Sequence, residues 1–97
     1  MIVTEENFEE MRQKCIDEVL KVMKGITPDA YIGGEGSEDG TYVVGTDHSD
    51  KILYIVHFDW EEVVEIAEAI EKKSLREWII EVNAGNYPNG NLPYLDN

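Results

Sequence analysis

The sequence predicts one α+β domain with an N-terminal helix, a three-stranded antiparallel sheet, two C-terminal helices and an irregular tail. Three observations support this prediction. Apolar residues near the N-terminus recur in steps of three and four, the period of a helix buried on one side. Three short stretches rich in β-branched and aromatic residues follow, separated by polar turns. Two later segments each place a side-chain acceptor three residues before a glutamate, a pattern typical of a helix start.

The first helix is expected over residues 5–24. Thr4 is its expected N-cap, because a threonine hydroxyl accepts a hydrogen bond from an otherwise unpaired N–H of the first turn. Val3 and Phe8 occupy the two positions of a hydrophobic staple. A glycine and a proline beyond the helix are expected to stop it. Its apolar stripe consists of Phe8, Met11, Cys15, Val19, Val22, Met23 and Ile26.

Three strands are expected over residues 30–34, 41–46 and 52–58. The connections between them are short, which favours antiparallel pairing, and Asp39-Gly40 is a strong turn signal between the first two. The third stretch is apolar at nearly every position. We therefore expect it to be the central strand of the sheet, with apolar contacts on both faces.

Two capping boxes, at residues 59–62 (Asp-Trp-Glu-Glu) and 74–77 (Ser-Leu-Arg-Glu), are expected to open the last two helices. The expected inward residues are Trp60, Val63, Val64, Ile66, Ala67 and Ile70 in the first of these helices and Leu75, Trp78, Ile79 and Val82 in the second. Gly85 is placed to end the last helix. We expect a single domain over residues 1–97, with its core within about residues 3–85 and an irregular tail over 86–97. The tail has apolar side chains that are placed to dock it onto the core: Tyr87, Leu92, Tyr94 and Leu95.

The net charge of −13 argues against direct binding of nucleic acid or of anionic membranes, because both are polyanions. The single cysteine, Cys15, excludes an intramolecular disulfide and fits a reducing cytoplasm. The longest mostly apolar run, Ile52–Phe58, is far shorter than the roughly 20 residues that span a bilayer as a helix. Residues 1–10 lack the basic and apolar regions of a secretory signal. We therefore expect a soluble, cytoplasmic protein.

The sequence contains no recognisable catalytic or metal-binding motif. Residues 47–50 (Asp-His-Ser-Asp) gather two carboxylates and an imidazole, but their spacing does not match a calcium-binding loop. Residues 33–36 (Gly-Gly-Glu-Gly) lack the lysine and the following helix of a phosphate-binding loop. Cys15 lies on an apolar stripe, whereas a cysteine nucleophile needs an accessible, electropositive setting. We expect no enzymatic activity, no bound metal and no cofactor.

The acidic residues are concentrated in the middle of the chain. Residues 29–71 contain twelve acids and one base, Lys51, and account for −11 of the net charge. In the second expected helix the glutamates fall three and four residues apart, where like charges cost a few tenths of a kcal/mol per pair. This row has no evident folding benefit, and together with the acidic loop before it the row resembles a line of phosphates. The candidate partner-binding residues are Glu35, Glu38, Asp39, Glu61, Glu62, Glu65 and Glu68.

These observations predict a non-enzymatic binding protein with a basic partner. In the leading hypothesis it is a nucleic-acid mimic, whose carboxylates compete for the phosphate-binding surface of a nucleic-acid-binding protein or enzyme. The alternative is a small accessory or assembly protein that binds through an apolar or tyrosine-rich patch, with the acids serving solubility only, as acidic surfaces often do. A small enzyme or metal-dependent protein is a third possibility. The oligomeric state stays open.

The order of the expected elements resembles that of double-stranded-RNA-binding domains. Those domains present basic residues to phosphates at their second helix, whereas here residues 59–62 (Asp-Trp-Glu-Glu) would repel RNA. In size, charge and element types the chain is similar to the small acidic inhibitors that phages and toxin systems direct against nucleic-acid enzymes. No motif is shared, so this resemblance is an analogy. It implies an inhibitor of the phage or immunity type.

Overall fold

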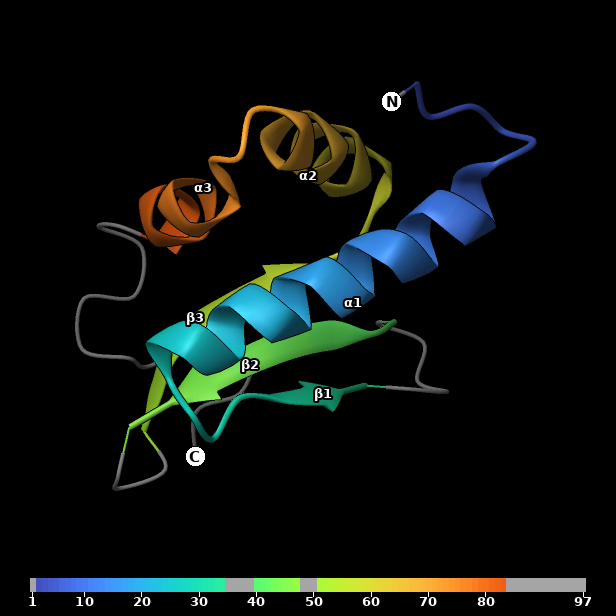
Figure 1. The fold of residues 1–97 in the computed structure, drawn as a ribbon. Coiled ribbons are helices and arrows are strands. Elements are labelled where there is room, and N and C mark those ends of the chain that lie inside the picture. Colours follow the sequence, from blue (N-terminus) through green and yellow to red (C-terminus); the bar gives the residue numbers. More distant parts are fainter. Residues whose placement is uncertain (1, 35–39, 48–50, 84–97) are drawn as a thin grey trace.

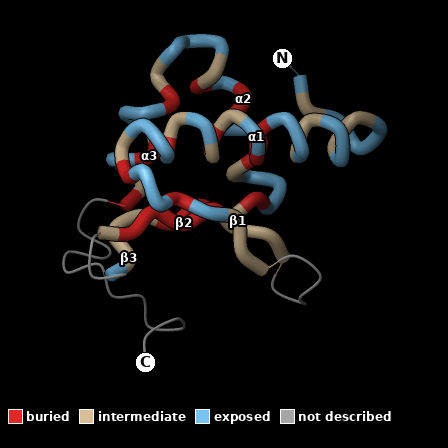
Figure 2. Tube along the Cα trace, turned by 60° about the horizontal axis from the view of Figure 1, so that its bottom comes forward, coloured by how far each residue is buried: buried red, intermediate tan, exposed pale blue. Residues whose placement is uncertain are grey.

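Three helices pack on one side of a small antiparallel sheet (Figures 1 and 2). The computed structural model describes residues 2–34, 40–47 and 51–83. The elements in chain order are α1 (Phe8–Ile26), β1 (Tyr31–Gly33), β2 (Tyr42–Thr46), β3 (Ile52–His57), α2 (Trp60–Glu71) and α3 (Leu75–Asn83). The chain is thus a small, compact α+β domain, and the predicted class and element order are confirmed. Within the described residues, none of the helices combines the length and apolar character needed to cross a membrane.

The start of α1 differs slightly from the prediction. The helix begins at Phe8, and Thr4 closes the turn that precedes it. The Thr4 hydroxyl accepts the backbone N–H of Asn7 at 3.2 Å, and the Asn7 side-chain oxygen accepts the N–H of Thr4 at 2.7 Å. This is the reciprocal pairing of a capping box, with an asparagine in the usual place of glutamate. Val3 and Phe8, the predicted staple residues, both pack against the core.

The sheet has the order β1-β2-β3, so β2 is the central strand. Our prediction that residues 52–58 form the central strand is wrong, because two consecutive hairpins necessarily place the middle strand between the others. The prediction of apolar contacts on both faces of β3 is confirmed. Val56 is buried in the core beneath the helices, and its neighbour Ile55 is buried in a separate cluster with Val44 on the opposite face. Val43 pairs with Val56 and Val44 with Ile55 in the register of β2 and β3.

Described residues at the ends of the two strand connections are consistent with turns there, although Asp39 of the predicted Asp39-Gly40 turn lies outside the described residues. Gly40, which precedes β2, has a φ of +81°, in the left-handed region that glycine tolerates best. At the other end of β2, the Asp47 carboxylate accepts the N–H of Lys51 at 2.9 Å, and the Lys51 carbonyl accepts the N–H of Asp47 at 2.9 Å. These two bonds close the polar turn between β2 and β3.

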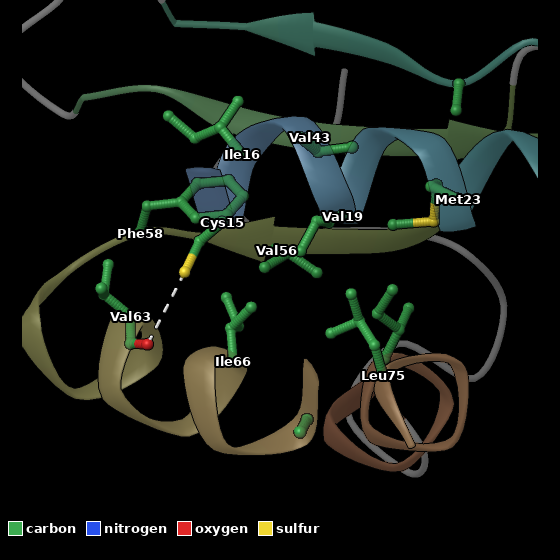
Figure 3. Close-up of a cluster of buried hydrophobic side chains, with 13 residues drawn as sticks. Cys15, Ile16, Val19, Met23, Val43, Val56, Phe58, Val63, Ile66 and Leu75 are labelled. Atoms are coloured by element: carbon green, nitrogen blue, oxygen red, sulfur yellow. Dashed lines mark hydrogen bonds between the residues drawn. The ribbon is translucent and has the colours of Figure 1, made fainter. Parts of the chain in front are cut away.

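The core lies between the sheet and the helices. Cys15, Val19 and Met23 of α1 meet Val43 and Val56 of the sheet, with α2 and α3 completing the cluster (Figure 3). The sheet approaches α1 closely at Gly45, where an added Cβ would lie 2.5 Å from the Thr27 hydroxyl and 3.0 Å from the Met23 sulfur. A side chain at this position of β2 would therefore collide with the end of α1.

Trp60 departs from the expected inward placement, and Trp78 meets it in part, since it packs against the core cluster. Trp60 is 44% exposed, as the first residue of α2, and its ring stacks on Phe8 with centroids 5.2 Å apart. Trp78 on α3 is only partly buried. Val64, also expected on the inner stripe, is 38% exposed, because Val63, Ile66 and Ala67 already fill the inward face of α2. Asp59 occupies the N-cap position as predicted, but its side chain makes no capping hydrogen bond.

Candidate functional site

The acidic residues predicted to bind a partner fall in two parts of the chain. Those of α2 project outward: Glu61, Glu65 and Glu68 are exposed, and Glu62 is partly buried. The helix carries five glutamates and no basic residue. The remaining candidates, Glu35, Glu38 and Asp39, lie outside the described residues. The described part of the candidate site is therefore the outer surface of α2 together with the neighbouring surface of α3.

A hollow of about 270 Å³ runs between α2 and α3 on this acidic side. It is open to solvent, and its lining contains four carboxylates and one ammonium group. We call it the α2/α3 groove, and its lining residues are Glu65, Glu68, Ala69, Lys72, Ser74, Glu77, Trp78 and Glu81. The groove exists because the short connection after Glu71 turns the chain back, so that α3 packs beside α2.

Glu65 and Trp78 join the two walls of the groove. The indole Nε1 of Trp78 donates a hydrogen bond to the Glu65 carboxylate at 3.0 Å. Because the acceptor is charged, this bond is stronger than one between neutral groups, and it restricts both side chains. Both residues also line a second hollow of about 310 Å³ that reaches β3 at His57. The Glu65–Trp78 pair therefore stands between two recesses of the same surface.

Glu68 is the only groove carboxylate with a described ion pair, and its partner is Lys72 at 2.8 Å. The hydrogen bond from Lys72 and the positive charge of Lys72 lower the pKa of the Glu68 carboxyl. Both side chains remain more than half exposed, so water screens the pair strongly. A competing cation can therefore take the place of Lys72 at little cost.

The other basic residues near the α2–α3 connection, Lys73 and Arg76, do not line the groove. Lys73 and Arg76 line a separate hollow with Glu18 of α1, on a different side of the helical pair. The groove therefore receives one cation against four carboxylates. Residues 72–97 contain three basic and three acidic residues. In the folded protein Glu77 and Glu81 line the groove, whereas Lys73 and Arg76 lie in the other hollow, so the groove surface is strongly negative.

Sequence reasoning missed three groove residues. Glu77 and Glu81 belong to a segment whose charges cancel in a linear count, and Trp78 was expected to point into the core. Glu77 and Glu81 are four residues apart and therefore lie on the same side of α3. This spacing is the one sequence feature that could have indicated a shared acidic surface. Which side of α3 faces α2 is set by the packing of Leu75 and Ile79 in the core, which a single sequence does not specify.

The chemistry available in the groove is recognition of a cation. Carboxylates at its rim attract lysine or arginine side chains, and an arginine also stacks favourably on an aromatic face such as that of Trp78. Among residues 2–34, 40–47 and 51–83, no group of three or more histidine, cysteine or acidic side chains is arranged to hold a metal ion. His48, Ser49 and Asp50, noted in the sequence, lie outside the described residues.

Cys15 has the character of a core residue. It is fully buried, and its Sγ–H donates to the Val63 carbonyl at 3.7 Å (Figure 3). Burial raises the pKa of the thiol to about 11, with nearby Lys14 acting weakly in the opposite direction. The thiol is therefore protonated at neutral pH and shielded from substrate, which does not suit a nucleophile.

A scan of this chain against protein-family models found no match. Searches of curated proteins and of solved structures also found no protein similar to it.

Proposed function

We propose that this chain is a non-enzymatic binding protein that engages a basic partner through the exposed acids of α2 and the α2/α3 groove. The partner class we propose is a nucleic-acid-binding protein or enzyme, whose phosphate-binding surface the carboxylates occupy. The protein would then act as an inhibitor by nucleic-acid mimicry. The observation that carries the proposal is the concentration of carboxylates around one groove: two from α2 and two from α3, with a single lysine among them.

The mechanism is competition between carboxylates and phosphates for the same lysine and arginine side chains. Along α2, residues three or four apart lie about 4.5–6 Å apart along the helix axis, a spacing of the same order as the phosphate rise along a nucleic-acid strand. Glu61, Glu65 and Glu68 repeat at this spacing and are exposed. Attraction of this kind speeds encounter and weakens as salt rises.

The first experiment is affinity capture from a lysate of the native host at low and at moderate salt. The test variant combines Glu61→Gln, Glu65→Gln and Glu68→Gln. The change Glu65→Gln keeps an oxygen that can accept the Trp78 indole N–H, so it alters charge with little effect on packing. The control carries the same charge change at three exposed glutamates outside the groove, near the start of α1: Glu5→Gln, Glu9→Gln and Glu10→Gln.

Nucleic-acid mimicry predicts that wild type and control capture a nucleic-acid-binding protein at low salt, while the test variant does not, and that salt abolishes the capture. Equal capture by test variant and control would contradict it. A defined probe sharpens the result: in a Trp60→Phe background Trp78 is the only tryptophan. An oligo-arginine peptide should then change its fluorescence in a saturable, salt-sensitive way, and much less in the test variant.

The alternative function, binding through an apolar patch, is supported by a different observation. Trp60 and Val64 lie four residues apart on α2 and are 44% and 38% exposed, beside Phe8. In this alternative the acids serve solubility only. Capture would then survive moderate salt and the glutamine substitutions, and it would be lost in a Val64→Ser variant.

A further inference from the structure

A hollow of about 280 Å³ lies where the three helices meet, separate from the acidic groove. Each helix packs against the other two (Figure 1). Leu75 is buried, and Val22 and Ile70 pack against the core cluster, so the packing that joins the helices also fixes this part of the wall. The full lining comes from all three helices and from the connection between α2 and α3: Glu18, Val22, Ile70, Lys73, Leu75 and Arg76.

The hollow combines an apolar wall with two cations. Lys73 and Arg76 are exposed residues of its lining, and Glu18 is its only acid. Two positive charges and one negative charge give the lining a net charge of +1, in a chain whose net charge is −13. Among the described residues, no ion pair or side-chain hydrogen bond engages either cation. Both cations are therefore available to a bound anion.

The backbone of Lys73 adopts an unusual conformation at the hollow. Its φ is +55°, and it is the one described residue other than glycine with a positive φ. The N–H of Lys73 donates to the Ile70 carbonyl at 3.1 Å, and the N–H of Ser74 donates to the Ala69 carbonyl at 2.9 Å. This pair of bonds ends a helix in a motif that usually has glycine in the left-handed position.

A lysine in the left-handed position costs stability that a glycine would not cost, because its Cβ crowds the backbone. Strain of this kind persists at places where the side chain has a function, so an observed outlier motivates a search for one. The side chain of Lys73 lines the hollow next to Arg76. Binding of an anion there would give a reason for a lysine at this position.

The chemistry of the lining favours a small ligand with one negative charge. Guanidinium and ammonium groups both bind carboxylates, and the apolar wall favours a ligand with an apolar body. The carboxylate of Glu18 repels a second negative charge on the ligand, which selects against a phosphate dianion. Sites for small molecules occupy roughly 300–1,000 Å³. The hollow lies at the lower end of this range, so the ligand is small.

We propose that this hollow binds a small monocarboxylate with a branched apolar body. The carboxylate meets Lys73 and Arg76, and the apolar body lies against Val22, Ile70 and Leu75. Lys73 then contributes to binding at the expense of stability. The proposal does not depend on the acidic groove, which engages ligands of the opposite charge.

The first test is a titration of the full chain with 4-methylpentanoate, followed through the methyl NMR signals of Val22, Ile70 and Leu75. Val44, in the cluster on the far face of the sheet, is the reference. We expect saturable shifts of the first three signals alone, with the millimolar affinity of a ligand of this size. The neutral amide, 4-methylpentanamide, should bind much more weakly. No saturable shift with the acid, or equal binding of the amide, would overturn the proposal.

The second test compares three variants at exposed positions. Lys73→Gly and Arg76→Gln should each weaken binding about two- to fivefold, the effect of one partly exposed ion pair. Lys72→Gln is the matched control, because Lys72 lines the acidic groove instead, and it should leave the affinity unchanged. Lys73→Gly should also raise the melting temperature by several degrees. Wild-type affinity in both test variants, or equal loss in the control, would overturn the proposal.

A third measurement identifies the source of the carboxylate. A free acid and the C-terminal end of a peptide present the same group, and N-acetyl-leucine reproduces the peptide end. Tighter binding of N-acetyl-leucine than of 4-methylpentanoate, lost in Arg76→Gln, would support the site and assign it to a peptide end. The reverse order, with the same loss, would support the site and assign it to a free acid.

Discussion

The replacement Asn83→Ala should be among the most damaging single substitutions at a polar residue of this protein. Asn83 is 5% exposed, and its side chain satisfies both the N–H and the carbonyl of Ile55. Alanine would leave these two backbone groups unpaired in a buried setting. Each such group costs about 1–3 kcal/mol, so we expect a loss of about 2–6 kcal/mol for the two. That is a large part of the roughly 5–15 kcal/mol that stabilises a typical domain.

The variant Asn83→Asp adds a dependence on pH. The introduced carboxylate can still accept the Ile55 N–H. In the wild-type protein the Asn83 side-chain nitrogen donates to the carbonyls of Ile55 and Ile79. An aspartate would instead place a negatively charged oxygen against these two carbonyls. Repulsion and burial should raise the pKa of the introduced acid above the value in the unfolded chain. The variant should therefore be less stable at pH 7 than at pH 4, relative to wild type at each pH.

Urea unfolding followed by tryptophan fluorescence at both pH values measures these differences. Asn7→Ala is the matched control, because the hydrogen bonds of Asn7 are exposed, and it should cost about 1 kcal/mol or less. A loss below about 0.5 kcal/mol for Asn83→Ala would refute the role of Asn83 as an edge partner of β3, since that is within the effect of an ordinary surface change.

Three further predictions concern packing, the thiol and the surface ion pair. Gly45→Ala should destabilise the protein by about 1–3 kcal/mol, because the added methyl group collides with Thr27 and Met23. Gly25→Ala lies in open space within α1 and should stabilise the protein by about 0.5–1 kcal/mol. Thermal unfolding of the two variants tests this, and equal shifts of the melting temperature would contradict it. Cys15 should resist alkylation near pH 8 unless urea is present, and rapid labelling of the native protein at pH 8 would disprove its burial. The pKa of the thiol in the folded protein, about 11, lies above the ordinary value of 9.0. The contribution of Cys15 to stability should therefore persist below pH 9 and fall as the pH approaches 11. Glu68→Gln should leave the midpoint of urea unfolding nearly unchanged, because water screens the exposed pair with Lys72, so a clear drop in the midpoint would show that this pair is more than a screened surface contact.

Much of the fold follows from local pattern. The helical stripe of α1 was readable because burial on one side imposes a repeat of three and four residues on any sequence. The strand pairing was readable because short connections allow little besides antiparallel hairpins. The positive φ of Gly40 agrees with the turn signal read there, because other residues rarely adopt positive φ. In each case the physical constraint acts within a few residues of the chain.

The candidate site was only partly readable. The exposed glutamates of α2 could be found from their spacing, and the structure places Glu61, Glu65 and Glu68 at its surface. Glu77, Glu81 and Trp78 could not be assigned to the same site, because they line it only when α3 packs beside α2. A linear charge count treats the region after Glu71 as neutral, whereas packing separates its acids from Lys73 and Arg76.

The sequence by itself determined which segments become helices and strands, and that the excess negative charge would be concentrated in the middle of the chain. Tertiary structure alone decided that Trp60 lies partly at the surface, that Glu77 and Glu81 join the α2/α3 groove, and that Asn83 pairs with the edge of β3. The physical reason is the range of the interactions involved. Helix periodicity, turn geometry and hairpin pairing act between near neighbours, but grooves and edge pairing depend on contacts between residues far apart in the chain, which exist only once the core has formed.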